Sequence, residues 1–258
     1  MSRSQHLFLL REMVKRDFQA RYAGSALGFL WSLLQPLWTL LLFTFVFATV
    51  LKIRPIGERT DNFAIFLFSG LIAWMAISEA LTRATTAITD NAELVKKLRF
   101  PAELLIVSIV LGALVHAGIA AVLFLVVLAV VGELQLSGLP LLLVALPLQV
   151  AMTIGIGMML SSVHVLFRDT AQLVSMFLNG WFYFTPIVYS LGFVPDRFRA
   201  WIEANPLTPL VGLYRAAFLG GSLKDAGDLL PLVLAAVLAA TLGYALFQRL
   251  ETTFADDI

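Results

Sequence analysis

The sequence contains no cysteine, and it carries little charge for its length. The absence of cysteine excludes disulfide bonds, thiolate metal sites and thiol catalysis, while it leaves the redox compartment undetermined. Charged residues make up 14% of the chain and hydrophobic residues 60%. A soluble domain of 258 residues could hardly expose this composition without aggregating, so the composition indicates a membrane-embedded protein.

Motifs for ATP hydrolysis, metal binding and nucleophilic catalysis are also missing. No glycine is followed by lysine, so the phosphate-binding loop of ATPases is absent. His6, His116 and His164 do not have the spacing of paired metal ligands, and Gly-x-Ser-x-Gly does not occur. We therefore expect that this chain is not an enzyme and that it binds no cofactor or metal of its own.

A concentrated basic face is missing as well. The net charge is +1, with 18 basic against 17 acidic residues, which argues against nucleic acid as a partner because binding to its backbone needs clustered positive charge. Residues 1–21 are rich in charge and lack an apolar core followed by a small-residue cleavage site. We expect that this segment is not a removable secretory signal.

What the chain has instead is six long apolar stretches, two of which, residues 22–51 and 134–167, carry no formal charge. The hydrocarbon core of a bilayer is about 30 Å thick and a helix rises about 1.5 Å per residue, so about 20 apolar residues can cross it. Because no alternating strand pattern is present, we predict an all-α membrane bundle. The predicted spans are residues 30–51, 63–81, 104–131, 139–161, 172–191 and 229–247.

Six crossings place both termini on one side of the membrane. Lys and Arg are denser in the segments on that side than in the other loops, which predicts cytoplasmic termini. We expect a single domain over residues 1–258. It is divided into an interface helix and turn (1–29), spans one to five (30–191), extracytoplasmic gate helices (192–228), and span six with its tail (229–258).

The N-terminal segment has the pattern of an amphipathic helix lying in the membrane surface. Its apolar residues recur at helical spacing and its basic residues fall around the other side, which suits anionic lipid. The apolar set is Leu7, Leu10, Val14 and Phe18. Gly24 and Gly28 then predict a turn or close packing before Trp31, an aromatic anchor of the membrane interface.

Residues 90–101, between spans two and three, predict a short capped helix. Asp90 or Asn91 can accept the first free amide hydrogens, Glu93 suits the positive end of the helix dipole, and Pro101 ends the helix. Two interpretations fit about equally: a positively charged cytoplasmic anchor, and a docking helix for a partner protein.

Residues 192–228, between spans five and six, predict two short helices that dip into the interface. Pro195 can begin the first, which carries Phe198 and Trp201, and Asn205-Pro206 ends it before the second. Re-entrant segments survive at membrane depth only under a cover of protein or beside water, which favours a gate. The alternative is an extracytoplasmic lid that only packs.

Polar residues within the spans should face other helices or a pathway, because they are costly in hydrocarbon. Glu79 and His116 can carry charge, so they either line a pathway or are structural, and Glu79 could be hydrated near a helix end. The full set is Gln35, Glu79, His116, Gln149, Thr153, Gln172 and Asn179. The aromatic cluster of residues 181–189 can stack on sugar rings or sit at the membrane interface.

The order of these segments resembles a known family. The motifs are Arg21-Tyr22, Leu27-Gly28, Trp31 to Pro36, Lys96 to Pro101, Phe167-Arg168-Asp169, Thr185 to Tyr189, and Asn205-Pro206 before Arg215. They resemble the transmembrane subunit of ABC type 2 polysaccharide exporters, the O-antigen, teichoic acid and capsule group, over essentially the whole chain.

The resemblance implies a homodimer with two copies of a separate ABC ATPase, which binds ATP and Mg. The substrate would be a polyprenyl-diphosphate-linked polysaccharide, with O-antigen as the first candidate, moved across the inner membrane. The implied ATPase-coupling residues are Asn91, Glu93, Leu94, Lys96, Lys97, Arg99, Phe100, Pro101, Arg168 and Asp169. The implied substrate entrance is Arg11, Lys15, Arg16, Arg21 and Tyr22. The candidate channel and gate residues are Trp31, Gln35, Trp181, Tyr183, Phe184, Tyr189, Phe198, Trp201 and Tyr214.

Other functions remain open at this point. A drug or lipid exporter would share the architecture without a sugar-lined path. A membrane transferase acting on polyprenyl lipids would need acidic metal-binding clusters in its loops, which the chain lacks. A membrane scaffold without transport would not explain the capped basic loop and the gate-like segment together.

Overall fold

The computed structural model describes residues 8–16, 27–52, 54–97, 101–222, 226–252 and 254. These residues form helices without a β-sheet, and one isolated bridge joins Gln135 to Leu219. Residues 8–16 are helical. The further α-helices are α2 (Trp31–Phe43), α3 (Phe63–Asp90), α4 (Ala92–Lys97), α5 (Glu103–Val131), α6 (Leu142–Leu166), α7 (Thr170–Phe184), α8 (Asp196–Glu203), α9 (Leu207–Phe218) and α10 (Leu230–Leu250). The π-helix is η2 (Thr44–Val50), and the 3-10 helices are η1 (Gly28–Leu30), η3 (Leu139–Leu141), η4 (Leu191–Phe193) and η5 (Ala226–Leu229).

Four helices in the described part of the chain are long and apolar enough to cross a membrane. They are Phe63–Asp90, Glu103–Val131, Leu139–Leu166 and Gly227–Leu250. The predicted first span is a shorter apolar helix, Trp31–Phe47, and the predicted fifth span forms the 15-residue α7. The all-α membrane fold is therefore confirmed, whereas the count of six crossings and the re-entrant position of the gate helices stay predictions.

Two predicted boundaries differ from the structure for identifiable reasons. The second span is predicted to end at residue 81, because the hydropathy of the sequence falls as Arg83 is approached. The α-helix itself continues to Asp90. The fifth span ends at Phe184, before residue 191. Thr185 is extended (φ −99°, ψ 134°) because the ring of Pro186 disfavours a helical conformation at the residue before it.

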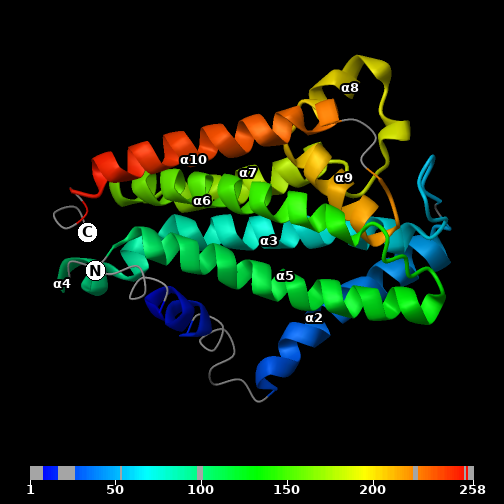
Figure 1. Cartoon of the computed structure of the whole chain (residues 1–258), viewed down its shortest axis with the longest axis horizontal. Helices are drawn as coiled ribbons and strands as arrows, with labels where there is room; N and C mark the ends of the chain where they lie inside the picture. Colours follow the sequence, from blue (N-terminus) through cyan, green and yellow to red (C-terminus); the bar gives the residue numbers. More distant parts are fainter. Residues whose placement is uncertain are drawn as a thin grey trace.

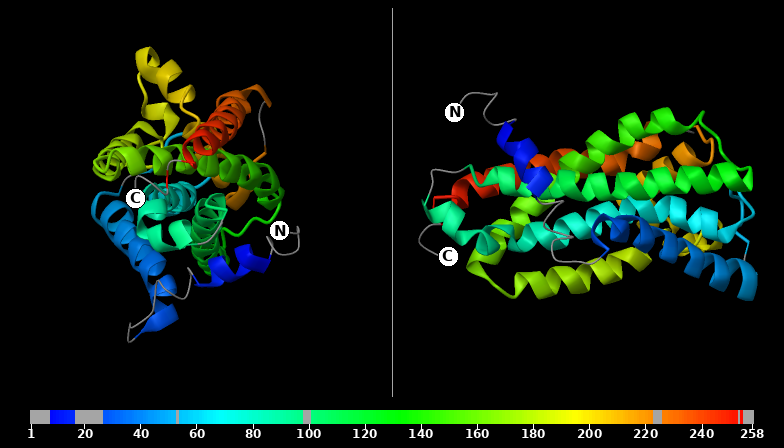
Figure 2. Two further views of the ribbon diagram at one scale, coloured as in Figure 1. Left: turned by 90° about the vertical axis from the view of Figure 1, so that its left-hand side faces the viewer. Right: turned by 90° about the horizontal axis from the view of Figure 1, so that it is seen from below.

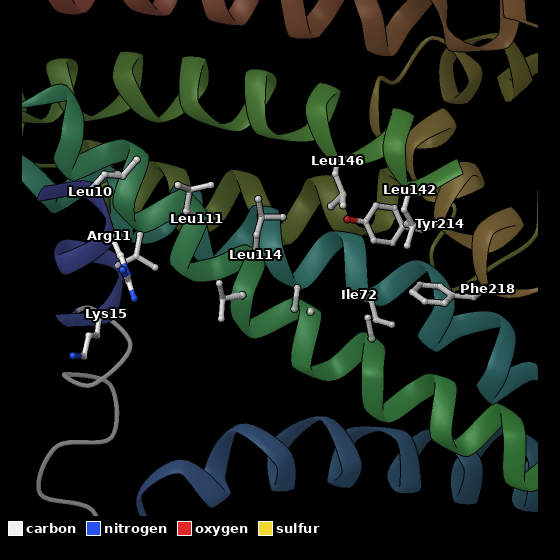
Figure 3. Close-up of a pocket in the computed structure, with 15 residues that line it drawn as sticks. Leu10, Arg11, Lys15, Ile72, Leu111, Leu114, Leu142, Leu146, Tyr214 and Phe218 are labelled. Carbon is white, nitrogen blue, oxygen red and sulfur yellow. The ribbon is translucent and has the colours of Figure 1, made fainter. Parts of the chain in front are cut away.

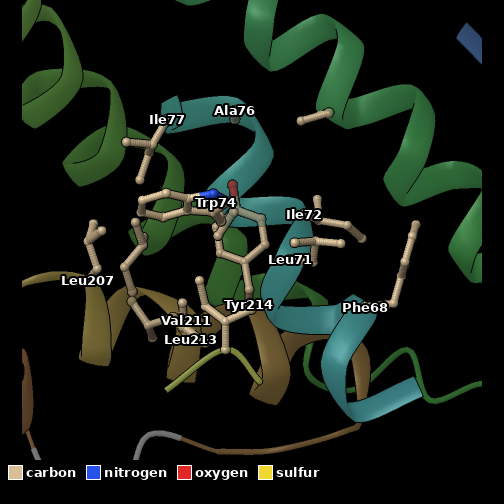
Figure 4. Packing of buried hydrophobic residues seen from close by; sticks show 14 of the residues in the cluster. Phe68, Leu71, Ile72, Trp74, Ala76, Ile77, Leu207, Val211, Leu213 and Tyr214 are labelled. Carbon is tan, nitrogen blue, oxygen red and sulfur yellow. The ribbon is translucent and has the colours of Figure 1, made fainter. Parts of the chain in front are cut away.

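The core is built around α3, which packs against α5, α6, α7 and α9 (Figure 1). Nearly every residue of its first half is buried. Figure 4 shows Trp74 and Ile77 of α3 facing Leu207 and Val211 of α9 within a cluster of buried hydrophobic residues. The gate segment is thus tied directly to the centre of the bundle.

The helices α6 and α10 approach each other closely. A Cβ atom on Gly243 of α10 would overlap the backbone of Gly155 of α6, and a Cβ atom on Gly155 would overlap the backbone of Ala239. Small residues at helix crossings in membranes let backbones pack closely, which replaces the missing hydrophobic driving force.

Segments from both ends of the chain meet at one end of the bundle. Met13 and Leu94 pack against a cluster that contains Ala102, Phe247 and Phe254. The helices α8 and α9 lie at the opposite end (Figure 1). The described parts of the two terminal segments therefore lie at the same end of the bundle, and the side of the membrane on which they lie stays a prediction.

The helices α2 and α7 lie on either side of α3 at one edge of the bundle, as the end-on view in Figure 2 shows. Both expose large apolar side chains. Those on α2 and η2 include Trp31, Leu34, Leu37, Trp38, Leu41, Leu42 and Phe45, and those on α7 include Leu173, Met176, Phe177, Tyr183 and Phe184. In the membrane these faces must contact lipid or a second protein surface.

Candidate functional site: a coupling helix, a basic-mouthed cavity and a gate segment

The predicted coupling segment forms α4, immediately after α3. Asn91 connects the two helices through its backbone carbonyl, which accepts from the amides of Leu94 (2.9 Å) and Val95 (3.1 Å). Its side-chain Nδ2 donates to the carbonyl of Ala87 (2.8 Å), and the Asp90 carboxylate accepts from Thr86 (2.6 Å). The expected side-chain cap of α4 is therefore wrong, because both side chains bond to the preceding helix.

The two faces of α4 differ in chemistry. Leu94 and Val95 pack against the cluster at this end of the bundle, whereas Glu93 and Lys96 are exposed. The helix is held by its apolar side and presents charge outward. Pro101 is half-buried. The side chain of Lys97, and Arg99 and Phe100 entirely, lie outside the described residues.

Arg168 and Asp169 form the exposed connection between α6 and α7. Val165, just before them, belongs to the same cluster as Ala102. This connection and α4 consequently lie at the same end of the bundle, as a shared contact with one partner requires.

The N-terminal helix, residues 8–16, borders a cavity with a volume of about 980 Å³. Figure 3 shows Leu10, Arg11 and Lys15 at one end of the cavity and Tyr214 and Phe218 at the other. Between them the walls are side chains of α3, α5 and α6, including Ile72, Leu111, Leu114, Val115, Leu142 and Leu146. Among the described residues that line it, Arg11 and Lys15 are the only charged ones.

Of the other predicted entrance residues, Arg16 is exposed and does not line the cavity, and Arg21 and Tyr22 lie outside the described residues. Gly28 has a φ of 48°, which fits the predicted turn before α2. Cations at one end of an apolar cavity suit an amphiphile with an anionic head and a hydrocarbon tail.

At the opposite end of the bundle, Asn205 organises the gate segment. Its Oδ1 accepts from Trp181 Nε1 (3.0 Å) and from the Leu207 amide (3.1 Å). Its Nδ2 donates to the Phe184 carbonyl (3.3 Å) and to Thr185 Oγ1 (3.0 Å). One side chain thus joins the end of α7 to the junction between α8 and α9. The sequence indicated only that Asn205 precedes a helix-breaking proline.

The aromatic gate candidates divide into an exposed group and a buried one. Tyr183, Phe184, Phe198 and Trp201 are exposed, and α8 contains no buried residue. Tyr189, half-buried, donates its hydroxyl to the carbonyl of Tyr183 (3.1 Å). The exposed group offers aromatic faces at one end of the bundle, where sugars can stack.

Tyr214 is instead buried within α9. Its hydroxyl donates to Gln149 Oε1 on α6 (2.6 Å), while Gln149 Nε2 donates to the carbonyl of Ala73 (3.4 Å). The next residue, Arg215, lies over the ring of Phe66 (3.7 Å) and donates to the Ile187 carbonyl (2.8 Å). These contacts fix α9 to three other segments, and Tyr214 does not face open solvent. Its role in the channel stays a prediction.

The remaining polar residues of the spans fall into two groups. Gln149 and Thr153 are buried between helices, as expected. Gln35 on α2, and Gln172 and Asn179 on α7, are exposed, as is Trp31. The exposed polar residues therefore lie on the two helices that flank α3.

Glu79 and His116 form a pair between α3 and α5, with 2.9 Å between Glu79 Oε2 and His116 Nδ1. The other oxygen of Glu79 lies 3.7 Å from Nη1 of Arg83. Among the described residues, no group of three or more His, Asp or Glu has the arrangement of a metal site.

Comparisons with known proteins place this geometry in context. The family model described as ABC-2 type transporter matches residues 9–219. The chain is 31% identical over 256 residues to the O-antigen export system permease protein RfbA of Myxococcus xanthus, covering 98% of this chain and 96% of that relative. It is 29% identical to the RfbA protein of Klebsiella pneumoniae, covering 96% and 94%. It is 24% identical to the polysialic acid transport protein KpsM of Escherichia coli, covering 92% and 91%.

Proposed function

Because the chain belongs to the ABC-2 type transporter family, we propose that it is the permease subunit of an ATP-driven polysaccharide exporter, with O-antigen as its substrate. The observation that carries this proposal is similarity over nearly the whole chain to permeases named for O-antigen export. Relatives named for polysialic acid transport and capsule polysaccharide export support the wider substrate class.

The energy for export comes from a separate ATPase in this proposal, since the sequence has no phosphate-binding loop. The helix α4, with exposed Glu93 and Lys96, docks on that ATPase, and Arg168 and Asp169 make a second contact. Two permease copies assemble with two ATPase copies in the inner membrane, with both termini in the cytoplasm. The paired ATPases bind the ATP and Mg.

The lipid-linked substrate enters beside the N-terminal helix. Arg11 and Lys15 attract its diphosphate, and the cavity of about 980 Å³ takes part of its polyprenyl chain. The exposed faces of α2 and α7 meet those of a second copy and enclose the path of the glycan. The exposed aromatic residues Tyr183, Phe184, Phe198 and Trp201 form the exit, where stacking is weak enough to let a polymer slide.

The test begins with co-purification of the chain with the ATPase encoded beside it, in nanodiscs. Intact complex should show ATPase activity that rises with added lipid-linked glycan, and a variant lacking residues 94–99 should lose the ATPase. Export is then measured as surface O-antigen in a strain whose own permease is deleted and which carries both subunits. A chain that purifies without the ATPase, or a complex stimulated by small amphiphiles and not by glycan, contradicts the proposal.

A further inference from the structure

Most residues of α3 are buried, and the positions that are half-buried or exposed form one polar stripe. They recur with the period of a helix, and all except Met75 are polar or charged. The set is Met75, Ser78, Glu79, Thr82, Arg83, Thr86, Thr89 and Asp90. A lipid-facing stripe on an apolar spanning helix would consist mostly of apolar residues.

The exposed residues of α5 are apolar instead. Val122, Val126 and Val130 are exposed there, and Val122 is 62% exposed. Those valines are what a lipid-facing helix should carry. The polar stripe of α3 is therefore not a lipid-facing surface.

The stripe reaches deep into the membrane. Glu79 pairs with His116, which lies near the middle of α5 (Glu103–Val131). At about 1.5 Å per residue, His116 lies about 20 Å from either end of that helix, in a hydrocarbon core about 30 Å thick. Partly exposed charge at this depth costs several kcal/mol unless water or protein surrounds it.

The stripe also lines a cavity of its own. A hollow of about 380 Å³ is lined by Met75, Ser78, Glu79, Thr82 and Arg83, all from α3. These residues belong to α3, the helix that contacts both α2 and α7. In the proposed function, the exposed faces of α2 and α7 enclose the glycan between two copies.

We propose that Ser78, Glu79, Thr82 and Arg83 form the sugar-binding wall of a water-filled translocation path through the inner half of the membrane. This inference rests on the proposed function and adds a binding surface to it. The ligand class is a hydrated glycan, recognised through its hydroxyl groups.

The hydrogen bonding of the stripe suits that ligand. The hydroxyls of Ser78 and Thr82 donate to carbonyls of their own helix, Met75 at 3.4 Å and Ser78 at 2.7 Å. Their oxygen lone pairs can accept from sugar hydroxyls, as can the carboxylate of Glu79, while Arg83 can donate. Neutral hydroxyl contacts repeated about every 5.4 Å along a helix are individually weak, so a polymer can pass from one to the next.

The absence of cysteine makes a direct test possible, because each single-cysteine variant carries one thiol. Ser78→Cys and Thr82→Cys are made in the complex with its ATPase and treated with a charged, membrane-impermeant thiol reagent. Val122→Cys is the matched lipid-facing control, and Arg54→Cys, in the exposed connection between α2 and α3, is the positive control. We expect Thr82→Cys to react at least about tenfold faster than Val122→Cys, because only a hydrated thiol ionises and reacts readily. Equal, slow reaction of Ser78→Cys, Thr82→Cys and Val122→Cys overturns the proposal, and would mean that the stripe is covered by the second copy or by lipid.

Contact with sugar is tested by adding lipid-linked glycan purified from a strain that lacks the permease. Protection of Thr82→Cys, but not of Arg54→Cys, supports the sugar-binding wall. If the glycan stimulates ATP hydrolysis while leaving the labelling of Thr82→Cys unchanged, the sugar contact is refuted and the proposed function stands. If the glycan does not stimulate hydrolysis, the proposed function fails, and the labelling rates alone decide whether the stripe faces water.

Discussion

Gly155 of α6 and Gly243 of α10 lie with their backbones in direct contact, so that a Cβ atom on Gly243 would occupy the space of the Gly155 carbonyl. This relationship makes the two helices one unit. Any side chain at either position must push the helices apart along their length, and lipid offers no hydrophobic force to return them.

We predict that Gly243→Val destabilises the protein by about 3 kcal/mol, because overpacking against backbone cannot be relieved by a rotamer change. Gly180→Val on α7 is the control, since a Cβ atom there meets nothing within 4 Å. The measurement is the midpoint of thermal unfolding in detergent. Similar midpoints for the two variants would show that the helices separate at little cost.

Arg215→Met should cost about 2–4 kcal/mol, because it removes the contact with the Phe66 ring and leaves the Ile187 carbonyl without its donor. Arg199→Met is a matched change in an exposed ion pair, with 3.0 Å to Glu203, and should cost less than about 1 kcal/mol. Thermal unfolding compares them. A smaller loss for Arg215→Met than for Arg199→Met would contradict the role assigned to Arg215.

Gly118→Leu should fill the cavity beside the N-terminal helix without disturbing the fold, because Gly118 lines that cavity and a Cβ atom there meets nothing within 4 Å. We expect about a tenfold rise in the concentration of lipid-linked glycan needed for half-maximal ATPase stimulation, as two methylene groups of the tail lose their place. Gly212→Leu has the same free space but does not line the cavity, and should leave this concentration unchanged. Identical curves for both variants would remove the cavity from the substrate path.

Lys96→Glu should weaken binding of the ATPase about tenfold without changing the stability of the permease, because Lys96 is exposed and reversing an interface charge opposes docking. Arg54→Glu makes the same reversal in an exposed residue between α2 and α3, outside α4. Retention of the ATPase during purification is measured at two salt concentrations. Equal retention by both variants would place the docking surface elsewhere.

Burial, reinforced by the carboxylate of Glu103, raises the pKa of Glu251, just beyond the end of α10. The folded state therefore binds a proton more tightly than the unfolded state does. Stability from this group is present below the ordinary pKa of glutamate and is lost as pH rises through the raised value. Glu251→Gln should raise the midpoint of thermal unfolding at neutral pH. It should also reduce the fall of that midpoint as pH rises from the ordinary pKa of glutamate to the raised pKa of Glu251. Glu103→Gln should act in the same direction, and a lower midpoint in both would contradict the assignment.

Hydropathy predicted the lipid-facing helices well and the interior ones less well. The predicted third span, 104–131, matches α5 (Glu103–Val131) to one residue, because a helix that contacts lipid must be apolar along its whole length. The end of α3 was missed because a helix shielded by protein and water can continue through Arg83, Thr86 and Asp90. The end of α7 could have been predicted from Pro186, because a residue that precedes proline disfavours the helical conformation.

The hydrogen bonds of Asn205 and the polar stripe of α3 could not be predicted from the sequence, for a different reason. Asn205 could be read as part of a break, but its bonds to Trp181 and Phe184 join residues more than 20 positions apart. The polar stripe had a local signal in the four-residue spacing of Ser78, Thr82 and Thr86. The spacing alone does not identify this stripe as the less buried side of α3. That requires the packing of the neighbouring helices, which buries the other faces of α3.

The contrast between α8 and α9 gives the gate segment a mechanical division. The helix α9 is anchored through Tyr214 and Arg215, while α8 contributes no buried residue and is joined to α9 across Asn205 and Pro206. Swinging α8 about that joint exposes no new apolar surface from α8 itself, whereas moving α9 would strip Arg215 of its partners inside the bundle. If the gate segment moves, we therefore expect the movement to take place in α8 and to leave α9 in position against α3.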